Sequence, residues 1–491
     1  MEPFATLLVS GLAIAAVACT KPNPAVCCLD TADCNEVGIS EPRSCNPGLA
    51  CVDHRCEVPS CAEAGCAAAA PVCNVTTDVC DPCASSEDCS RFADTPVCET
   101  SSGGCVQCLA SGDCAAVAGA PVCETTTRTC VQCLGPTDCS GAKPICDANM
   151  CRAPRVDSDC PSGAMGDEGT CIGEGDVVYL DPNGTDVASC NRAVPCQSLA
   201  FAVSVTMAAR FHVVLAPGQY PTNAVVFGPT QTLAPALYFH GHGAEILGPT
   251  SGDACGIELA LSTTIYDLRY TVRGGGAQTA MCMSAGTTLE RVTIANGAGS
   301  TAVQTSVSFI AHDLVVSNGY GGIVAVSGSL TLDRAVLHGM QRAIETYGAS
   351  SLQLTNVITY GTSVRGLQLA SGTSGTVGSS TFVTAGANFG GARVADCPSG
   401  VLIRSSIIWA PGATTPLILG CNLSNVIAGP AVVSGASNAD PLFVDLVQNN
   451  FHLASGSPAR DAVDTGPATD FEGDARPQGT RFDIGADEAA P

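Results

Sequence analysis

Four cysteines recur every 25 residues in the first third of the chain, and this repeat limits what that region can fold into. The register reads C-x2-C-x5-C-x8-C-x6, with Cys80, Cys105 and Cys130 at one of its four positions. The chain places 25 of its 31 cysteines before residue 172, and only 4% of its residues are aromatic. Disulfide bonds therefore replace a hydrophobic core here, and they persist only in an oxidising compartment. The repeat predicts an exported protein.

The amino-terminal segment agrees with export. Residues 4–17 are apolar over about the length of a signal-peptide core and are too short to span a bilayer. They run into Ala16-Val17-Ala18 directly before Cys19, a sequence that resembles a bacterial lipobox. We expect residues 1–18 to be a signal peptide and Cys19 to carry the lipid of an outer-membrane or cell-surface lipoprotein. Secretion as a soluble extracellular protein is the alternative.

The charge balance disfavours some partners. The chain has 45 acidic and 21 basic residues, which give a net charge of −24. That charge argues against nucleic acid or an anionic membrane surface as a partner. It suits a protein exposed to extracellular solvent.

Residues 19–171 are predicted to form a stalk of disulfide-stapled repeats with little regular structure. Pro, Gly, Thr and Asp are frequent there, and no helical or strand period is sustained. The alternative is a metal site, because pairs such as Cys80 and Cys83 have the C-x2-C spacing of zinc ribbons. Export favours disulfides over zinc. The pairing among the stalk cysteines stays open.

A different texture begins at residue 176, where short β-rich runs each end near a glycine. Residues 289–294 precede Gly297, and residues 310–316 precede Gly319. Steps of 20 to 26 residues between such glycines indicate a β-solenoid. We predict an all-β parallel β-helix over residues 176–491, with roughly ten to twelve turns of three strands stacked about 4.8 Å apart. A carboxy-terminal cap is expected from about residue 436.

Both ends of this region resemble a known family. The segments VYLDPNG at 178–184, PCQSL at 195–199 and VLAPGQY at 214–220 resemble the first turns of pectate-lyase-like right-handed parallel β-helix proteins. The segments DPLF at 440–443 and DIGADE at 483–488 resemble the terminal part of bacterial surface β-helix proteins. The resemblance implies the fold and no single activity, because this fold hosts lyases, hydrolases, adhesins and inert surface proteins.

Alignment of the turns places acids and bases alternately in one column. Neighbours in such a column, about 4.8 Å apart, are expected to form a ladder of salt bridges and hydrogen bonds. The catalytic alternative has Asp267 and Asp313 hold a cation while Arg291 or Arg334 acts as the base. The column contains Asp267, Arg291, Asp313, Arg334, Asn356, Ser380 and Ser406.

An enzyme of the resembled family needs more than this column supplies. Its lyases use Ca²⁺ held by several carboxylates together with an Arg or Lys base, but no lysine lies beyond Lys143. Its hydrolases use three close aspartates and a Gly-His-Gly element. His240 and His242 imitate that element in an early turn, without paired aspartates before them. His312 and His338 flank the column and are expected to be surface histidines.

Candidate binding residues are few. Tyr320, Tyr347 and Tyr360 follow three successive turns and are expected to form a modest aromatic stripe. The single tryptophan, Trp409, follows two isoleucines and is expected in the core. No cofactor and no metal site are expected. Structural Ca²⁺ at the carboxylates near the carboxy terminus is the alternative.

The six cysteines of the coil region are expected to pair by position. Two pairs are separated by 27 and 24 residues, close to one turn each, so their members are stacked neighbours within reach of a disulfide. A third pair lies in one short loop. The predicted bonds are Cys190–Cys196, Cys255–Cys282 and Cys397–Cys421.

These observations favour a cell-surface lipoprotein anchored to the membrane through Cys19. Its β-helix head is expected to be a non-enzymatic module that contacts glycans or other surface partners. The alternative is a secreted polysaccharide lyase or glycoside hydrolase that acts on one face of the β-helix.

Overall fold

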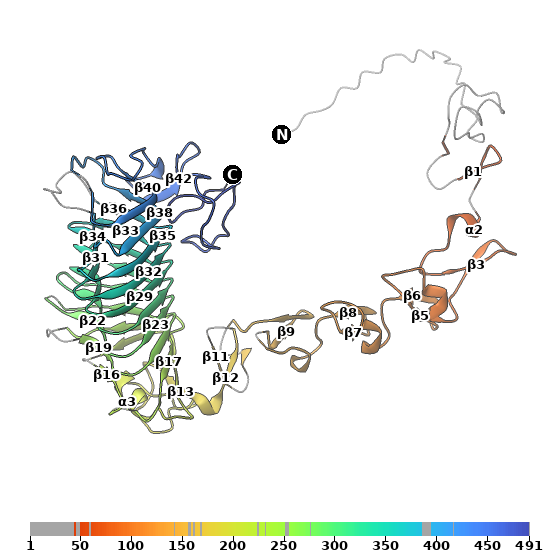
Figure 1. Ribbon diagram of the computed structural model, residues 1–491. Helices are drawn as coiled ribbons and strands as arrows, with labels where there is room; N and C mark the ends of the chain where they lie inside the picture. Colours follow the sequence, from red (N-terminus) through yellow and green to blue (C-terminus); the bar gives the residue numbers. More distant parts are fainter. Residues whose placement is uncertain are drawn as a thin grey trace, which may run out of the picture. The chain divides into compact units, whose positions relative to one another are not determined.

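A computed structural model describes the chain from residue 44 (Figure 1). The chain forms two compact units, and the boundary between them in the sequence lies after Arg152. The expected signal peptide and Cys19 lie outside the described residues. No helix in the described part combines the length and apolar character that a bilayer crossing requires. The structure describes residues 44–45, 50–57, 60–141, 143–155, 159–160, 163–166, 169–222, 225–230, 232–250, 255–274, 276–384, 394–415 and 417–490.

Each repeat of the first unit is a short antiparallel hairpin held by two crossed disulfides. In the repeat that begins at Cys108, this residue bonds Cys123 while Cys114 bonds Cys130, with Cα–Cα distances of 5.9 and 5.6 Å. The first cysteine thus pairs with the third, and the second with the fourth. The same crossing joins Cys61–Cys73 with Cys66–Cys80, Cys83–Cys98 with Cys89–Cys105, and Cys133–Cys146 with Cys139–Cys151.

The hairpins place the third and fourth cysteines of a repeat opposite each other without bonding them. Cys123 and Cys130, for example, are direct cross-strand partners, and each bonds a cysteine before the hairpin. The strands are β3 (Val72–Asn74) with β4 (Val79–Asp81), β5 (Val97–Glu99) with β6 (Gly104–Val106), β7 (Val122–Glu124) with β8 (Thr129–Val131), and β9 (Ile145–Asp147) with β10 (Met150–Arg152). A further hairpin of β1 (Ala50–Val52) and β2 (Arg55–Glu57) precedes them, and helix α2 (Cys61–Ala64) follows it.

The C-x2-C pairs are links between successive repeats. Cys105 closes one repeat and Cys108 opens the next, so the two never bond to each other. Between them, the Gln107 side chain accepts a hydrogen bond from the Cys130 backbone N–H at 2.7 Å and ties the link to the following hairpin. Spacing that resembles a zinc ribbon therefore serves as a connector in which every sulfur belongs to a disulfide.

An aspartate orders the loop in front of three of the hairpins. Asp113, within the 3₁₀ turn η2 (Ser111–Cys114), accepts hydrogen bonds from two backbone N–H groups at 2.8 and 2.9 Å. These bonds lower the pKa of the Asp113 carboxyl. Buried sulfur from Cys108 and Cys114 occupies the centre of the repeat, where larger domains have aliphatic side chains. The equivalent turns are η1 (Ser86–Cys89) and η3 (Pro136–Asp138).

The second unit is a parallel β-solenoid of about nine turns (Figure 1). Each full turn contributes three short strands, and equivalent strands of successive turns pair in parallel register. We call the three stacks columns A, B and C. Columns A and B belong to one 19-stranded sheet, and column C is a 9-stranded sheet.

The strands of each column have the following bounds. Column A contains β13 (Val177–Leu180), β14 (His212–Leu215), β17 (Leu237–His240), β20 (Thr263–Tyr266), β23 (Thr287–Glu290), β26 (Phe309–His312), β29 (Gly328–Asp333), β32 (Ser350–Thr355) and β35 (Ser374–Gly378). Column B contains β15 (Gln219–Pro221), β18 (Glu245–Leu247), β21 (Arg269–Thr271), β24 (Thr293–Ala295), β27 (Val315–Ser317), β30 (Val336–His338), β33 (Ile358–Thr362) and β36 (Thr381–Thr384). The long strands β38 (Val401–Trp409) and β40 (Asn422–Gly429) continue both columns. Column C contains β16 (Val225–Phe227), β19 (Cys255–Leu259), β22 (Thr279–Met283), β25 (Thr301–Thr305), β28 (Gly321–Ala325), β31 (Arg342–Thr346), β34 (Arg365–Gln368), β37 (Ala395–Asp396) and β39 (Ile418–Leu419).

The solenoid interior is a continuous aliphatic core. In column A, the inward residues Leu289, Ala311 and Leu332 stack on one another and are buried. At the first turns, helix α3 (Leu199–Ser204) adds Leu199 to the same core. Before these turns lie the hairpin of β11 (Gly163–Met165) and β12 (Cys171–Gly173), closed by the Cys160–Cys171 bond, and the 3₁₀ turn η5 (Glu174–Asp176).

After β40 the chain folds back beside the last turns instead of extending the solenoid. Outward side chains of column B, Ile358 and Ile407, are buried there against Phe451. Trp409 belongs to the same cluster and is 6% exposed, as its isoleucine neighbours suggested. The solenoid therefore has about nine turns rather than the ten to twelve expected, because the last sixty or so residues cover its side. This segment includes the hairpin of β41 (Phe443–Asp445) and β42 (Asn450–Leu453).

The six coil cysteines are brought together as the sequence spacing suggested. Two bonds join strands or corners of adjacent turns, and the third closes a loop before the first full turn. Their Cα–Cα distances lie within the range that disulfides require. The bonds are Cys190–Cys196 (4.9 Å), Cys255–Cys282 (5.7 Å) and Cys397–Cys421 (5.1 Å).

Candidate functional site

Each turn bends from column A to column B at one residue with a left-handed backbone. The φ angles of Asp267, Arg291, Asp313 and Arg334 are 48, 52, 53 and 51°. A residue other than glycine rarely adopts this conformation, so its repetition at one corner marks a constraint of the fold. We call this set of residues the corner column. Its later members are Asn356, Ser379, Ser405 and Asn425.

The predicted column was wrong by one residue in its last two turns. Strand register places Ser379 above Asn356 and Ser405 above Ser379, where the sequence alignment had Ser380 and Ser406. Both turns have two consecutive serines at this corner, Ser379-Ser380 and Ser405-Ser406, so residue type alone does not tell which serine continues the column. Ser380 and Ser406 instead point inward and bond backbone groups.

The first four members of the corner column form two bidentate ion pairs. Arg291 Nε and Nη2 lie 2.7 and 2.8 Å from the carboxylate oxygens of Asp267. Arg334 binds Asp313 in the same way at 2.6 and 2.9 Å, and it also reaches Asp333 at 2.7 Å. The pairs are partly exposed, so each adds only about 0–1 kcal/mol to stability.

This geometry opposes the catalytic interpretation of the four residues. The hydrogen bonds that Arg334 donates to Asp313 raise the pKa of the Arg334 guanidinium, which keeps it protonated and unsuited to remove a proton. Arg291 lies between Asp267 and Asp313 along the column, so these carboxylates are separated by two turns, roughly 10 Å. Two carboxylates at that distance with a guanidinium between them do not share a cation.

The candidate histidines occupy different surroundings. His240 is buried, stacks on Tyr266 and lies with Nε2 3.0 Å from Nδ1 of His212. Burial and the neighbouring His240 lower the pKa of His212 to about 4, so the His212 side chain is neutral near pH 7. His312 lies between Glu290 and Asp333, at 3.9 and 3.8 Å.

The predicted tyrosine stripe is divided. Tyr320 and Tyr347, 37% and 61% exposed, lie on the column C side, where the Arg342 guanidinium sits 5.5 Å from the Tyr320 ring centre. Arg342 also pairs at 2.8 Å with the buried carboxylate of Glu345. Tyr360 belongs to column B, where it stacks on His338 and contacts Phe451. Tyr320 and Tyr347, together with Arg342, thus form an exposed aromatic patch. Tyr360 instead packs against the carboxy-terminal segment.

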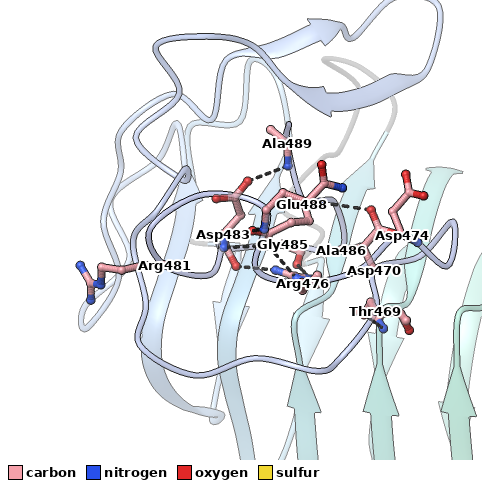
Figure 2. Close-up of polar contacts among 12 residues, drawn as sticks. Thr469, Asp470, Asp474, Arg476, Arg481, Asp483, Gly485, Ala486, Glu488 and Ala489 are labelled. Atoms are coloured by element: carbon pink, nitrogen blue, oxygen red, sulfur yellow. Dashed lines mark hydrogen bonds and ion pairs between the residues drawn. The ribbon is translucent and has the colours of Figure 1, made fainter. Parts of the chain in front are cut away.

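The carboxylates near the carboxy terminus mainly accept hydrogen bonds from backbone N–H groups. Figure 2 shows Arg476 at the centre of this network, with its Nε 2.8 Å from Glu488 Oε2, both side chains fully buried. Asp483 accepts hydrogen bonds from the Asp461 and Ala489 backbone N–H groups at 2.6 and 2.8 Å. Asp470 accepts from three further N–H groups. The DIGADE segment therefore closes the chain end by charge-assisted hydrogen bonds.

One cluster in this region escaped the sequence reasoning. Donor atoms of His452, Glu472 and Asp487 lie within 4.8 Å of one another, and Asp487 bonds His452 Nδ1 at 2.7 Å. Burial alone would lower the pKa of His452, but the Asp487 bond and the surrounding carboxylates raise it above its usual value. The residues are up to 35 positions apart and join only through the folded segment, so no spacing signal reveals them.

No model of a known protein family matches the chain, and a search of curated proteins finds no match either.

Proposed function

We propose that this chain is a bacterial cell-surface lipoprotein whose β-solenoid head, of the pectate-lyase-like type, binds glycans without cleaving them. The observation that carries the proposal is the pairing of the corner column. Arg291 and Arg334, the two residues suited by position to act as bases, are each held by an aspartate. Binding needs no cofactor. The exposed Tyr320 and Tyr347 beside Arg342 support it, because aromatic faces and guanidinium groups are common sugar contacts.

The disulfide-rich repeats support an extracellular location. Crossed bonds in at least four successive repeats require an oxidising environment, and buried sulfur provides their core. In the proposed arrangement, a lipid on Cys19 attaches the mature chain to the outer membrane or cell surface, and the repeats separate that anchor from the solenoid.

The anchor is tested by changing Cys19 alone. We expect wild-type protein to partition into the detergent phase and to incorporate a labelled fatty acid. The Cys19→Ala variant should lack the label and appear in the aqueous phase. A wild-type protein that is unlabelled and soluble would show secretion without an anchor.

The absence of turnover is tested on the full mature chain with neutral and acidic polysaccharides, with and without Ca²⁺. We expect retention of the protein on at least one polysaccharide and no new chain ends. Arg291→Ala and Arg334→Ala should leave retention unchanged, because their guanidinium groups serve the corner column. If chain cleavage occurs and either substitution abolishes it, the protein is a polysaccharide lyase or hydrolase.

A further inference from the structure

A hollow of about 350 Å³ lies where the corner column passes under the carboxy-terminal segment. Its origin is visible in the strand register of column A. The outward residue is Asp333 in one turn, then Thr355, Gly378 and Arg404 in the next three. Gly378 has no side chain, so a space opens between Thr355 and Arg404. Thr465 and its neighbours in the carboxy-terminal segment form the opposite wall.

Arg404 is distinguished by its lack of a protein partner. Every other arginine described from residue 177 onward forms an ion pair or donates from its side chain to a carbonyl. The exposed Arg404 side chain forms neither kind of contact with the described residues, and its stem lies over Gly378. The chain as a whole has a net charge of −24. The other described residues that line the hollow are uncharged, so the Arg404 guanidinium gives the hollow a positive charge.

Two serines of the corner column line the same hollow. Ser379 and Ser405 are 4% and 8% exposed and occupy the corner column. Neither hydroxyl has a hydrogen-bond partner within the described part of the chain, although both residues line the hollow. Both hydroxyl oxygens are accessible from the hollow, because neither is among the enclosed side-chain atoms that lack a partner. A ligand in the hollow can therefore accept a hydrogen bond from each of them.

The carboxylates near the hollow pair with other arginines. Asp464, beside Thr465, pairs with Arg481 at 2.8 Å. Asp333, two turns below Gly378, shares Arg334 with Asp313. Neither Asp333 nor Asp464 lines the hollow, and of the residues that the structure describes Arg404 is the one charged residue that does, so the site favours an anion.

We propose that this hollow binds a sugar that carries a sulfate or phosphate ester. A carboxylate has two oxygens, which one bidentate guanidinium satisfies by itself. A tetrahedral ester has three terminal oxygens, which match the Arg404 guanidinium together with the Ser379 and Ser405 hydroxyls. Thr355 and Thr465 remain to bond sugar hydroxyls. The volume lies near the lower end of small-molecule sites, which span about 300–1,000 Å³. This assignment rests on the proposed glycan-binding function.

The test uses calorimetric titration of the full mature chain with glucose 6-sulfate, glucose 6-phosphate, glucose and galacturonate. We expect both esters to bind, and glucose and galacturonate to bind at least tenfold more weakly. Arg404→Ala should weaken ester binding about 10- to 100-fold, the usual effect of losing hydrogen bonds to a charged group. Gly378→Thr should also block binding, because its side chain would occupy the space that Gly378 leaves open. Thr355 has this side chain at the equivalent position of the preceding turn.

Matched variants separate the outcomes. Arg269→Ala removes another exposed arginine of the solenoid, 58% exposed, and should leave ester affinity unchanged. Thermal unfolding of each variant checks that the fold is retained. Arg404→Ala binding the esters as tightly as wild type, or tighter binding of galacturonate than of either ester, would overturn the assignment. Retention on polysaccharides without any ester binding would refute the assignment alone, whereas ester binding without retention would refute the wider proposed function.

Discussion

Replacement of Arg476 by methionine should lower the free energy of unfolding of the carboxy-terminal segment by about 3–5 kcal/mol. The substitution leaves the Glu488 carboxylate buried without its cationic partner, 2.8 Å away in the native protein. Arg476 also donates to the Gly485 and Asp483 carbonyl groups, which would lose these bonds (Figure 2). Fluorescence of Trp409, the single tryptophan, follows the transition in urea because this residue packs between the solenoid and the segment.

Arg481 provides the matched control for this substitution. Its pair with Asp464 has a similar length, 2.8 Å, but the two side chains are 44% and 83% exposed. Arg481→Met should therefore change stability by less than about 1 kcal/mol. The double variant Arg476→Met with Glu488→Gln should recover part of the loss, because it removes the uncompensated charge. Equal effects of the Arg476 and Arg481 substitutions would contradict the account of a buried pair.

Removal of one disulfide from a repeat should unfold that repeat and spare its neighbours. The Cys108–Cys123 bond closes a loop of 15 residues, and loss of a native disulfide from a small domain costs about 2–5 kcal/mol. Little else stabilises the repeat, because its core is the sulfur of Cys108, Cys114 and Cys123. In the variant with alanine at positions 108 and 123, limited proteolysis with mass spectrometry should detect new cuts between these positions.

A disulfide of the solenoid tests whether the effect is local. Alanine at Cys255 and Cys282 removes a bond between adjacent strands that remain paired along their lengths. The repeats should keep their wild-type protease resistance in this variant. If the Cys108–Cys123 variant resists proteolysis as well as wild type, the repeat has a source of stability other than its disulfides.

The solenoid was predictable because its repeat is local. Residues such as Leu289 and Ala311 occur one turn apart in sequence and stack directly, so glycine spacing and β-rich runs reveal the architecture. The same periodicity identified the bond between Cys397 and Cys421. It failed at Ser379 and Ser405, because each is followed by a second serine and the approximate repeat length does not distinguish the two.

Other features depend on tertiary structure that spacing does not encode. Four cysteines in a repeat allow three pairings, and only the hairpin places Cys123 and Cys130 so that both bond earlier cysteines. The partners Arg476 and Glu488 are both polar in a segment that reads as a solvated cap, yet folding buries both completely. Arg404 stood in a β-rich run without any motif, and its lack of a partner is a property of the folded surface.

The corner column fixes the backbone of one residue per turn while most of its side chains remain outside the core. Acid, base, amide and hydroxyl side chains all occupy this position, at a pitch of about 4.8 Å. The residue at this position can therefore differ in charge from one turn to the next without a change in the core packing behind it. A polymer whose repeat length is a multiple of the spacing between turns would contact a regular series of side chains, one from each turn.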